Sequence, residues 1–261
     1  MNYPYTQSVI YDFSRAADGY DAHAQLQQSV MQSLLFAAET YIPADATVLD
    51  IGCGTGNFAR AAHMRMPKWQ IDGLDLSPAM CAKAAPFYRA VVQGDMATLP
   101  IAPFTYDACV SNLALQWCAR PAQAIAEMAR ILPAGGYAVF STFTSKTLME
   151  LRDSSREAGL HETVMPFASF SELQQWIEQA DCFVEFSRRV QETHHVPEVM
   201  QLVKQLRGIG ATNKLQTRPK HLSSPGRFST MMRAYQSRYK TPLGIPVTWD
   251  IAMFILKKPL V

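Results

Sequence analysis

The chain has 261 residues, of which 48% are hydrophobic and 18% are charged. This composition excludes a disordered protein, and the length suits one large domain or a domain with an insertion. No apolar run approaches the ~20 residues that span a bilayer, and residues 1–15 lack the basic start and apolar core of a secretory signal. The five cysteines show no CxxC spacing, so we expect free thiols in the cytoplasm, no metal site and no disulfide framework.

The formal net charge of +2 conceals two opposite parts of the chain. Residues 1–199 hold 13 Lys/Arg and 21 Asp/Glu, whereas residues 200–261 hold 11 Lys/Arg and a single acid, Asp250. Such asymmetry predicts that the basic end meets an anionic partner, although charge alone does not separate nucleic acid, a membrane and an acidic protein.

Strands alternate with helices through the first part of the chain. Apolar residues at helical spacing predict a helix over 25–41, which Pro43 stops. Further helices are expected over 57–66, from the cap Ser77-Pro78 and from Pro121 through 132. Short apolar segments between them predict strands over 47–51, 70–75, 90–93, 106–111 and 137–142. This alternation is typical of a doubly wound α/β fold with a mostly parallel sheet.

The later part is less regular but continues the pattern. Helices are predicted over 171–179, over 198–206 and from Ser224-Pro225, with strands over 182–193 and 247–256. We therefore describe a single domain of residues 1–261. Its parts are an N-terminal helical lid over 1–42, a Rossmann-like core over 43–193, a basic helical insertion over 194–244 and a final strand over 245–261.

A glycine-rich turn follows the first predicted strand, in Val48-Leu-Asp-Ile-Gly-Cys-Gly-Thr-Gly56. Glycines there let the backbone approach a ligand closely, and Asp75 ends the next strand where an acid can bind both ribose hydroxyls. Asp95 follows the third strand. The spacing is one residue shorter than the dinucleotide fingerprint, and Asp50 would repel a pyrophosphate. A ligand carrying a sulfonium and an ammonium group, such as S-adenosylmethionine, would suit that charge.

Three segments together resemble the class I S-adenosylmethionine-dependent methyltransferases, over about residues 45–143: Asp50-Ile-Gly-Cys-Gly-Thr-Gly56, Leu74-Asp75-Leu76-Ser77 and Gly94-Asp95-Met96. The resemblance implies a Rossmann-like sheet, mostly parallel with an antiparallel last strand, a helical insertion or lid, and S-adenosylmethionine as cofactor without a metal. It places the glycines near the methionine moiety, Asp75 on the ribose and Asp95 at the adenine. The expected cofactor-binding residues are Tyr20, Asp50, Gly52, Gly54, Gly56, Asp75, Leu76, Asp95, Met96 and Asn112.

Three other segments, taken in order, resemble the BioC family of malonyl-acyl-carrier-protein O-methyltransferases over nearly the whole chain. They are Phe13-Ser-Arg-Ala-Ala-Asp-Gly-Tyr-Asp21, Ser111-Asn-Leu-Ala-Leu-Gln-Trp-Cys118 and Leu206-Arg-Gly-Ile-Gly-Ala-Thr-Asn213. The resemblance implies methyl transfer to the free carboxylate of a malonyl thioester, giving a methyl ester for biotin synthesis. It also implies acyl carrier protein as the partner, with neither nucleic acid nor membrane.

The chemistry of a carboxylate acceptor agrees with the residues. A carboxylate is already ionised at neutral pH, so the reaction needs alignment and exclusion of water rather than a general base. The residues expected to provide this are Tyr20, Asn112, Gln116 and Trp117. Arg15 or Arg207 could hold the acceptor carboxylate through bidentate contacts. Acceptor-binding candidates, including those in a docking surface for the carrier, are Arg15, Trp117, Lys204, Arg207, Lys214, Arg227 and Arg233.

Other functions remain open from the sequence. A methyltransferase of another small carboxylic acid or of a quinone precursor would explain residues 45–143 but not the basic insertion. An RNA methyltransferase would use the basic surface on phosphates, although no separate RNA-binding module is recognisable. A non-catalytic nucleotide-binding protein would not need Asp75 and Asp95 beside an intact glycine loop.

Overall fold

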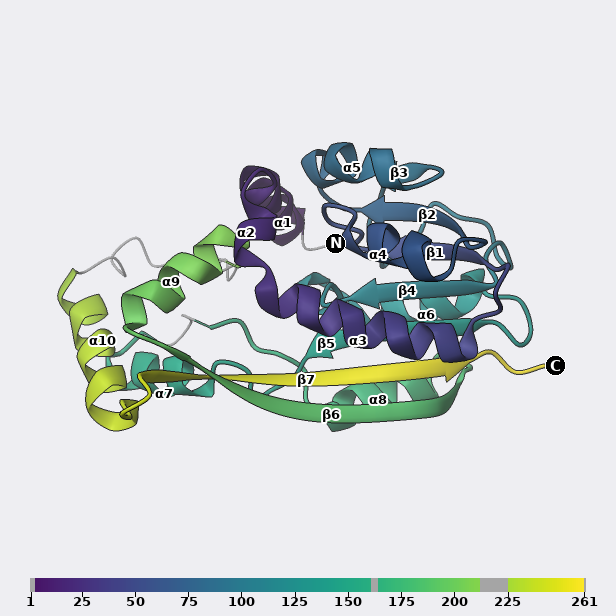
Figure 1. The fold of residues 1–261 in the computed structure, drawn as a ribbon. Coiled ribbons are helices and arrows are strands. Elements are labelled where there is room, and N and C mark those ends of the chain that lie inside the picture. The colour runs from purple at the N-terminus through teal and green to yellow at the C-terminus, as the bar shows by residue number, and fades with distance from the viewer. Residues whose placement is uncertain (1–2, 161–163, 212–224, 261) are drawn as a thin grey trace.

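The computed structural model describes residues 3–160, 164–211 and 225–260, and these form a seven-stranded sheet of order β3-β2-β1-β4-β5-β7-β6 (Figure 1). The first five strands run parallel, whereas β7 is antiparallel to both of its neighbours, β5 and β6. The doubly wound, mostly parallel sheet with an antiparallel last strand is therefore confirmed. The strands are β1 (Thr47–Ile51), β2 (Gln70–Asp75), β3 (Val91–Gln93), β4 (Ala108–Asn112), β5 (Tyr137–Phe143), β6 (Phe183–Val196) and β7 (Ile245–Lys257).

Helices cover both faces of the sheet because each carries an apolar stripe. On one face pack α3 (Gln25–Tyr41), α4 (Asn57–Arg65) and the region of α5 (Pro78–Ala84) with the short helix η1 (Ala85–Phe87). On the other face pack α6 (Pro121–Ile131) and α8 (Phe170–Glu178). The short helix η2 (Leu115–Trp117) follows β4.

The remaining helices gather beyond the carboxyl ends of the parallel strands. They are α1 (Tyr3–Ala16), α2 (Tyr20–His23), α7 (Met149–Glu157), α9 (Val199–Gly208) and α10 (Pro225–Tyr239). Figure 1 shows α1 and α2, in purple, beside α9, in green. A third apolar cluster joins α7, α9 and α10 to the start of β7. This end of the sheet is where open α/β folds bind their ligands.

Three α-helices were not expected as elements of their own. The helices α1 and α2 lie in the segment that we described as a helical lid without giving them bounds. The helix α7 has a polar sequence, but Glu150 is 3% exposed and accepts hydrogen bonds from the hydroxyl and the backbone N–H of Thr248. A helix that buries polar side chains on hydrogen-bond partners lacks the full apolar stripe by which helices are recognised in a sequence.

The observed start of β4 also differs from the expected one. The strand begins at Ala108 rather than Tyr106, because Tyr106 and Asp107 are bound by other partners. The backbone N–H of Tyr106 donates to the carbonyl of Ile131, and the carboxylate of Asp107 accepts from the N–H of Thr47 at 2.8 Å. Within the described residues, no helix is long and apolar enough to cross a membrane.

Candidate functional site

The turn after β1 can be built only with glycine at two of its positions. Gly52, Gly54 and Gly56 have φ angles of 79°, 55° and 89°, in the left-handed region. A Cβ atom on Gly52 would lie 2.4 Å from the Cβ of Ala114, and one on Gly56 would lie 2.7 Å from the ring of Phe87. The backbone of the loop is therefore close to the β4 loop and open to a ligand.

The carboxylate of Asp75 is bound to this loop. It accepts the backbone N–H of Gly54 at 2.9 Å and that of Ser77 at 2.8 Å. Burial raises the pKa of Asp75, and these N–H donors oppose the rise. Its position at the carboxyl end of β2 suits a polar ligand group lying across the crevice between β1 and β2.

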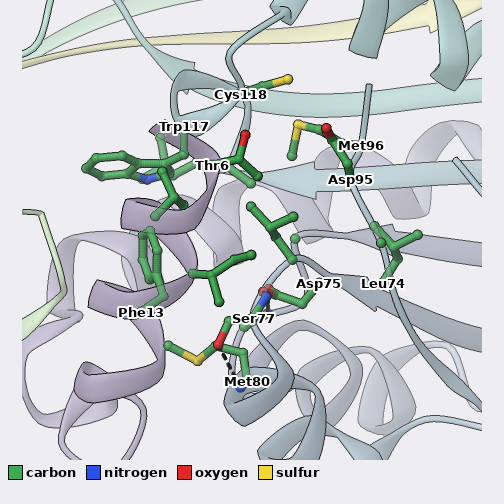
Figure 2. Close-up of a pocket in the computed structure, with 18 of the residues that line it drawn as sticks. Thr6, Phe13, Leu74, Asp75, Ser77, Met80, Asp95, Met96, Trp117 and Cys118 are labelled. Atoms are coloured by element: carbon green, nitrogen blue, oxygen red, sulfur yellow. Dashed lines mark hydrogen bonds between the residues drawn. The ribbon is translucent and has the colours of Figure 1, made fainter. Parts of the chain in front are cut away.

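A cavity enclosing about 780 Å³ of open space lies above the glycine loop. Figure 2 shows its lining, with Thr6 and Phe13 on the helix α1 side and Asp95 with Met96 on the opposite side. The cavity brings together most of the expected cofactor-binding residues, namely Tyr20, Gly52, Gly54, Asp75, Leu76, Asp95, Met96 and Asn112.

Helix α1 closes one side of this cavity. Val9 is 3% exposed, and the hydroxyl of Ser14 lies 2.9 Å from the hydroxyl of Ser77. The ring of Phe13 meets Trp117 edge-on at 5.3 Å between centroids and lies 6.4 Å from the ring of Tyr20. Sequence reasoning assigned no role to Thr6, Val9 or Ile10, although their spacing with Phe13 is that of one helix face.

A smaller hollow lies on the other side of the glycine loop, and Asp50 lines it. Asp50 is 2% exposed and accepts a hydrogen bond from the hydroxyl of Tyr88 at 2.5 Å. Burial raises the pKa of Asp50 to about 7; the Tyr88 hydrogen bond opposes that rise and the charge of Asp75 adds to it. A positively charged ligand group in this hollow would favour the ionised carboxylate.

Asp95 forms the far end of the main cavity, next to Met96. One carboxylate oxygen caps the backbone N–H of Ala97 at 2.9 Å, and the other lies 3.4 Å from the guanidinium of Arg120. Arg120 carried no motif in the sequence. Its location follows from the loop between η2 and α6, which sequence alone did not place.

The amide side chains at the end of β4 are held at both ends. Asn112 donates to the carbonyl of Gln27 at 3.0 Å and accepts from the hydroxyl of Ser141 at 2.9 Å. Gln116 donates to the carbonyl of Leu113 and accepts from the hydroxyl of Thr142 at 3.0 Å. Asn112 lines the main cavity, whereas Gln116 lines a neighbouring hollow, so the two amides do not face the same space.

These residues fit S-adenosylmethionine. The glycines of the loop that line the cavity, Gly52 and Gly54, have no side chains to obstruct a ligand. Asp75 offers acceptor oxygens, and Leu76 and Met96 provide apolar walls for a planar base. Asp50 places an acid beside the hollow where a cationic amino-acid tail would lie. An anionic dinucleotide would meet both carboxylates instead.

Comparison with known proteins identifies the family. A family model described as a methyltransferase domain matches residues 49–140. The chain is 35% identical to the malonyl-[acyl-carrier protein] O-methyltransferase of Serratia marcescens over 250 residues, covering 94% of each chain. It is 34% identical to the enzyme of that name from Methylococcus capsulatus, over 94% of this chain and 91% of that one. The chain belongs to the malonyl-[acyl-carrier protein] O-methyltransferase family.

The fold of this methyltransferase also resembles solved structures. A Bacillus halodurans protein described as a methyltransferase superposes with a TM-score of 0.64 at 15% identity, over 88% of this chain and 99% of that chain. The cofactor is S-adenosylmethionine, and the reaction class is methyl transfer.

The third family-like segment explains how the methyltransferase covers its cofactor cavity. A Cβ atom on Gly208 would lie 1.6 Å from the imidazole of His23, in α2. Gly210 has a φ of 71°, and a Cβ atom there would lie 3.2 Å from the carbonyl oxygen of Asp12. The glycines therefore allow the end of α9 to pack directly on α1 and α2.

The expected acceptor cations lie on the surface of the methyltransferase. Arg15 is exposed, and its guanidinium donates to the hydroxyl of Tyr11 at 3.3 Å. Neither Arg15 nor Arg207 lines the cofactor cavity. Lys204, Arg207, Arg227 and Arg233 are exposed on α9 and α10, whereas Lys214 lies outside the described residues. Among the described residues no group of His, Cys, Asp and Glu could hold a metal ion.

Proposed function

We propose that this methyltransferase transfers a methyl group from S-adenosylmethionine to the free carboxylate of malonyl-acyl carrier protein, giving a methyl ester for biotin synthesis. The observation that supports this proposal is that three helices, α1, α2 and α9, pack together over the cofactor cavity. Helix α9, which bears Lys204 and Arg207, packs on α1 and α2 through Gly208 and Gly210. An anionic carrier bound to the insertion would therefore sit beside the transfer point.

Methyl transfer to a carboxylate does not need a side chain that acts as a general base. Bound S-adenosylmethionine supplies a methyl group on a positively charged sulfur, and a carboxylate oxygen takes it as the carbon–sulfur bond breaks with its electron pair left on sulfur. Because the malonyl carboxylate is ionised at neutral pH, no side chain has to remove a proton. Phe13, Tyr20 and Trp117 form an aromatic wall that would keep water from the transfer point.

The charge of the insertion supports a carrier protein rather than a free acid. Six cations lie on the described part of the insertion: Lys204, Arg207, Arg227, Arg233, Arg238 and Lys240. The insertion carries one acid, the exposed Glu198, whereas Asp250 is fully buried and bound by Arg189 at 2.7 Å, so the cations of the insertion remain in excess. We place the reaction in the cytoplasm, where the free cysteines would stay reduced.

The test is a comparison of acceptors with methyl-labelled S-adenosylmethionine. Malonyl-acyl carrier protein, malonyl-coenzyme A, free malonate and an RNA are incubated separately with the enzyme. We expect label on the malonyl carrier as a base-labile methyl ester, and weaker labelling of malonyl-coenzyme A. Label on RNA, or on free malonate in preference to the carrier, would overturn the proposal in favour of the other methyltransferase classes.

A further inference from the structure

A second large cavity lies away from the cofactor cavity, where α2 and the start of α3 meet α9 and the adjoining ends of β6 and β7. It has a volume of about 840 Å³ and is open to solvent. The glycine contact of α9 on α2 forms part of its wall, because Gly208 packs on His23 and His23 lines the cavity.

This cavity adjoins the hollow beside the glycine loop. Gln27 lines both of them. The carbonyl oxygen of Gln27 also accepts a hydrogen bond from Asn112 at 3.0 Å, and Asn112 lines the cofactor cavity. Shared lining residues thus connect the cofactor cavity with the space under α9.

The walls of the second cavity combine amide, imidazole and apolar groups. Gln25, Gln27 and Gln205 supply amides, and His23, His194 and His195 supply imidazoles. The apolar groups come from α3, β6, β7 and the end of α9, and none of the lining residues is acidic. Lys204 and Arg207 lie on the same helix as Gln205, but they do not line the cavity.

A competing cavity lies on the other side of the site and differs in charge. It encloses about 1020 Å³, is lined by residues such as Gln116 and Trp176, and shares Cys118 with the cofactor cavity. Its charged lining residue is an acid, Glu172, on α8. An anionic ligand would therefore favour the cavity under α9.

We propose that the cavity under α9 binds the phosphopantetheine arm of the acceptor, with its thioester end directed toward the transfer point. This rests on the proposed function. The arm carries two amides, a hydroxyl, a dimethyl-substituted carbon and a phosphodiester. The glutamine amides suit the amides of the arm, and the apolar walls suit its dimethyl group. The exposed cations of α9, Lys204 and Arg207, lie outside the cavity, where the phosphodiester of a carrier-bound arm would be.

The test fills each cavity in turn. Gln205→Trp narrows the cavity under α9 from an exposed helix position, and Pro166→Trp is the matched control at an exposed position of the competing cavity. Both are assayed with malonyl-coenzyme A and with malonyl-N-acetylcysteamine, which lacks most of the arm. We expect Gln205→Trp to raise the KM for malonyl-coenzyme A about tenfold and to leave that for the truncated thioester nearly unchanged. Pro166→Trp should change neither, and circular dichroism confirms folding.

The outcomes separate this inference from the proposed function. Equal slowing of both acceptors by Gln205→Trp, or a selective effect of Pro166→Trp, would overturn the arm site while methyl transfer to malonyl thioesters stands. If the wild-type enzyme methylates no malonyl thioester, the proposed function fails. Calorimetric titration with coenzyme A then still reports arm binding. We expect binding by the wild type and Pro166→Trp that Gln205→Trp loses, and unchanged binding in Gln205→Trp would overturn the site.

Discussion

Two carboxylates of the cofactor region, the buried Asp50 and the half-buried Asp75, differ in how they are held. Asp75 is fixed by backbone N–H groups of the glycine loop and the β2 loop, whereas Asp50 is fixed by the hydroxyl of Tyr88. Asp75 therefore serves the shape of the loop as well as the ligand. The surroundings of Asp50 favour its protonated form, and a cation bound nearby would favour its ionised form. Asp50 therefore contributes to ligand binding mainly through its charge.

Replacement of Asp75 by alanine should weaken S-adenosylmethionine binding at least about tenfold, since charge-assisted hydrogen bonds contribute about 1.5–3 kcal/mol each. It also leaves the N–H groups of Gly54 and Ser77 without their acceptor, so the melting temperature should fall modestly. Calorimetric titration measures the affinity, and Asp45→Ala, at an exposed acid remote from the cavity, is the control. An Asp75→Ala protein with wild-type affinity would place the adenosine elsewhere.

Asp50 should make cofactor affinity depend on pH. Its pKa is raised to about 7, so in the free protein the carboxyl group stabilises the fold at low pH, and that contribution is lost as pH rises from about 4 to about 7. A cation bound nearby favours the ionised form. Affinity for S-adenosylmethionine should therefore increase roughly five- to tenfold between pH 6 and pH 7.5.

The control for this pH dependence is Asp50→Asn, which keeps the shape and cannot ionise. Its affinity should vary much less over the same interval. Parallel pH profiles for the two proteins, measured by calorimetric titration, would show that another group titrates.

At the scale of elements, the contact of α9 with the N-terminal helices depends on Gly210. An alanine there would adopt a left-handed backbone, which costs about 1–2 kcal/mol, and would press on the carbonyl of Asp12 in α1. Gly159→Ala is a matched control, because Gly159 has a φ of 68° and no atom within 4 Å of an added Cβ. Both variants should lose similar stability in thermal unfolding, but only Gly210→Ala should release S-adenosylmethionine faster in stopped-flow experiments. Equal release rates would show that α9 does not hold α1 over the cavity.

The elements that sequence predicted well are those whose apolar pattern faces the sheet. The glycine loop, Asp75 and Asp95 could be found because strand ends in this fold converge at one edge. The bounds of helix α1 were not predicted because its apolar face meets a cavity and α5 rather than the sheet. Helix α7 was missed because its Glu150 is buried and hydrogen-bonded to Thr248. Whether Gln116 and Arg207 face the cofactor cavity depends on the path of the loops and the orientation of the lid helices. The hydrophobic periodicity of the sequence does not determine either of these.

At the scale of the whole molecule, positive charge gathers at the end of the sheet that holds the site. Of the basic residues after 200, Lys257 and Lys258 lie at the far end of β7, beside the amino ends of the parallel strands. The exposed cations of α9 and α10 lie at the carboxyl ends, beside the cofactor cover. A carrier steered by this field would arrive at the correct end.

Reversal of Lys204, Arg227 and Arg233 to glutamate should raise the KM for malonyl-acyl carrier protein about tenfold or more and leave the KM for S-adenosylmethionine nearly unchanged. Added salt should weaken wild-type carrier binding in the same way, because the Debye length is about 8 Å at physiological ionic strength. The control reverses three cations at the opposite end, Lys68, Lys257 and Lys258. If both triple variants lose the carrier equally, net charge rather than a docking surface governs the encounter.

The ladder between β6 and β7 ends with Val196 opposite Ile245. The chain thus leaves the sheet after Val196 and returns to it at Ile245, at adjacent positions, so the segment between them can change length or sequence without altering the strand register. Replacing this one segment would give the same core a new acceptor. The replacement would need a glycine at the position of Gly210, where the backbone packs directly on α1. This connection between β6 and β7 would allow related enzymes to keep the same cofactor while their acceptor substrates change.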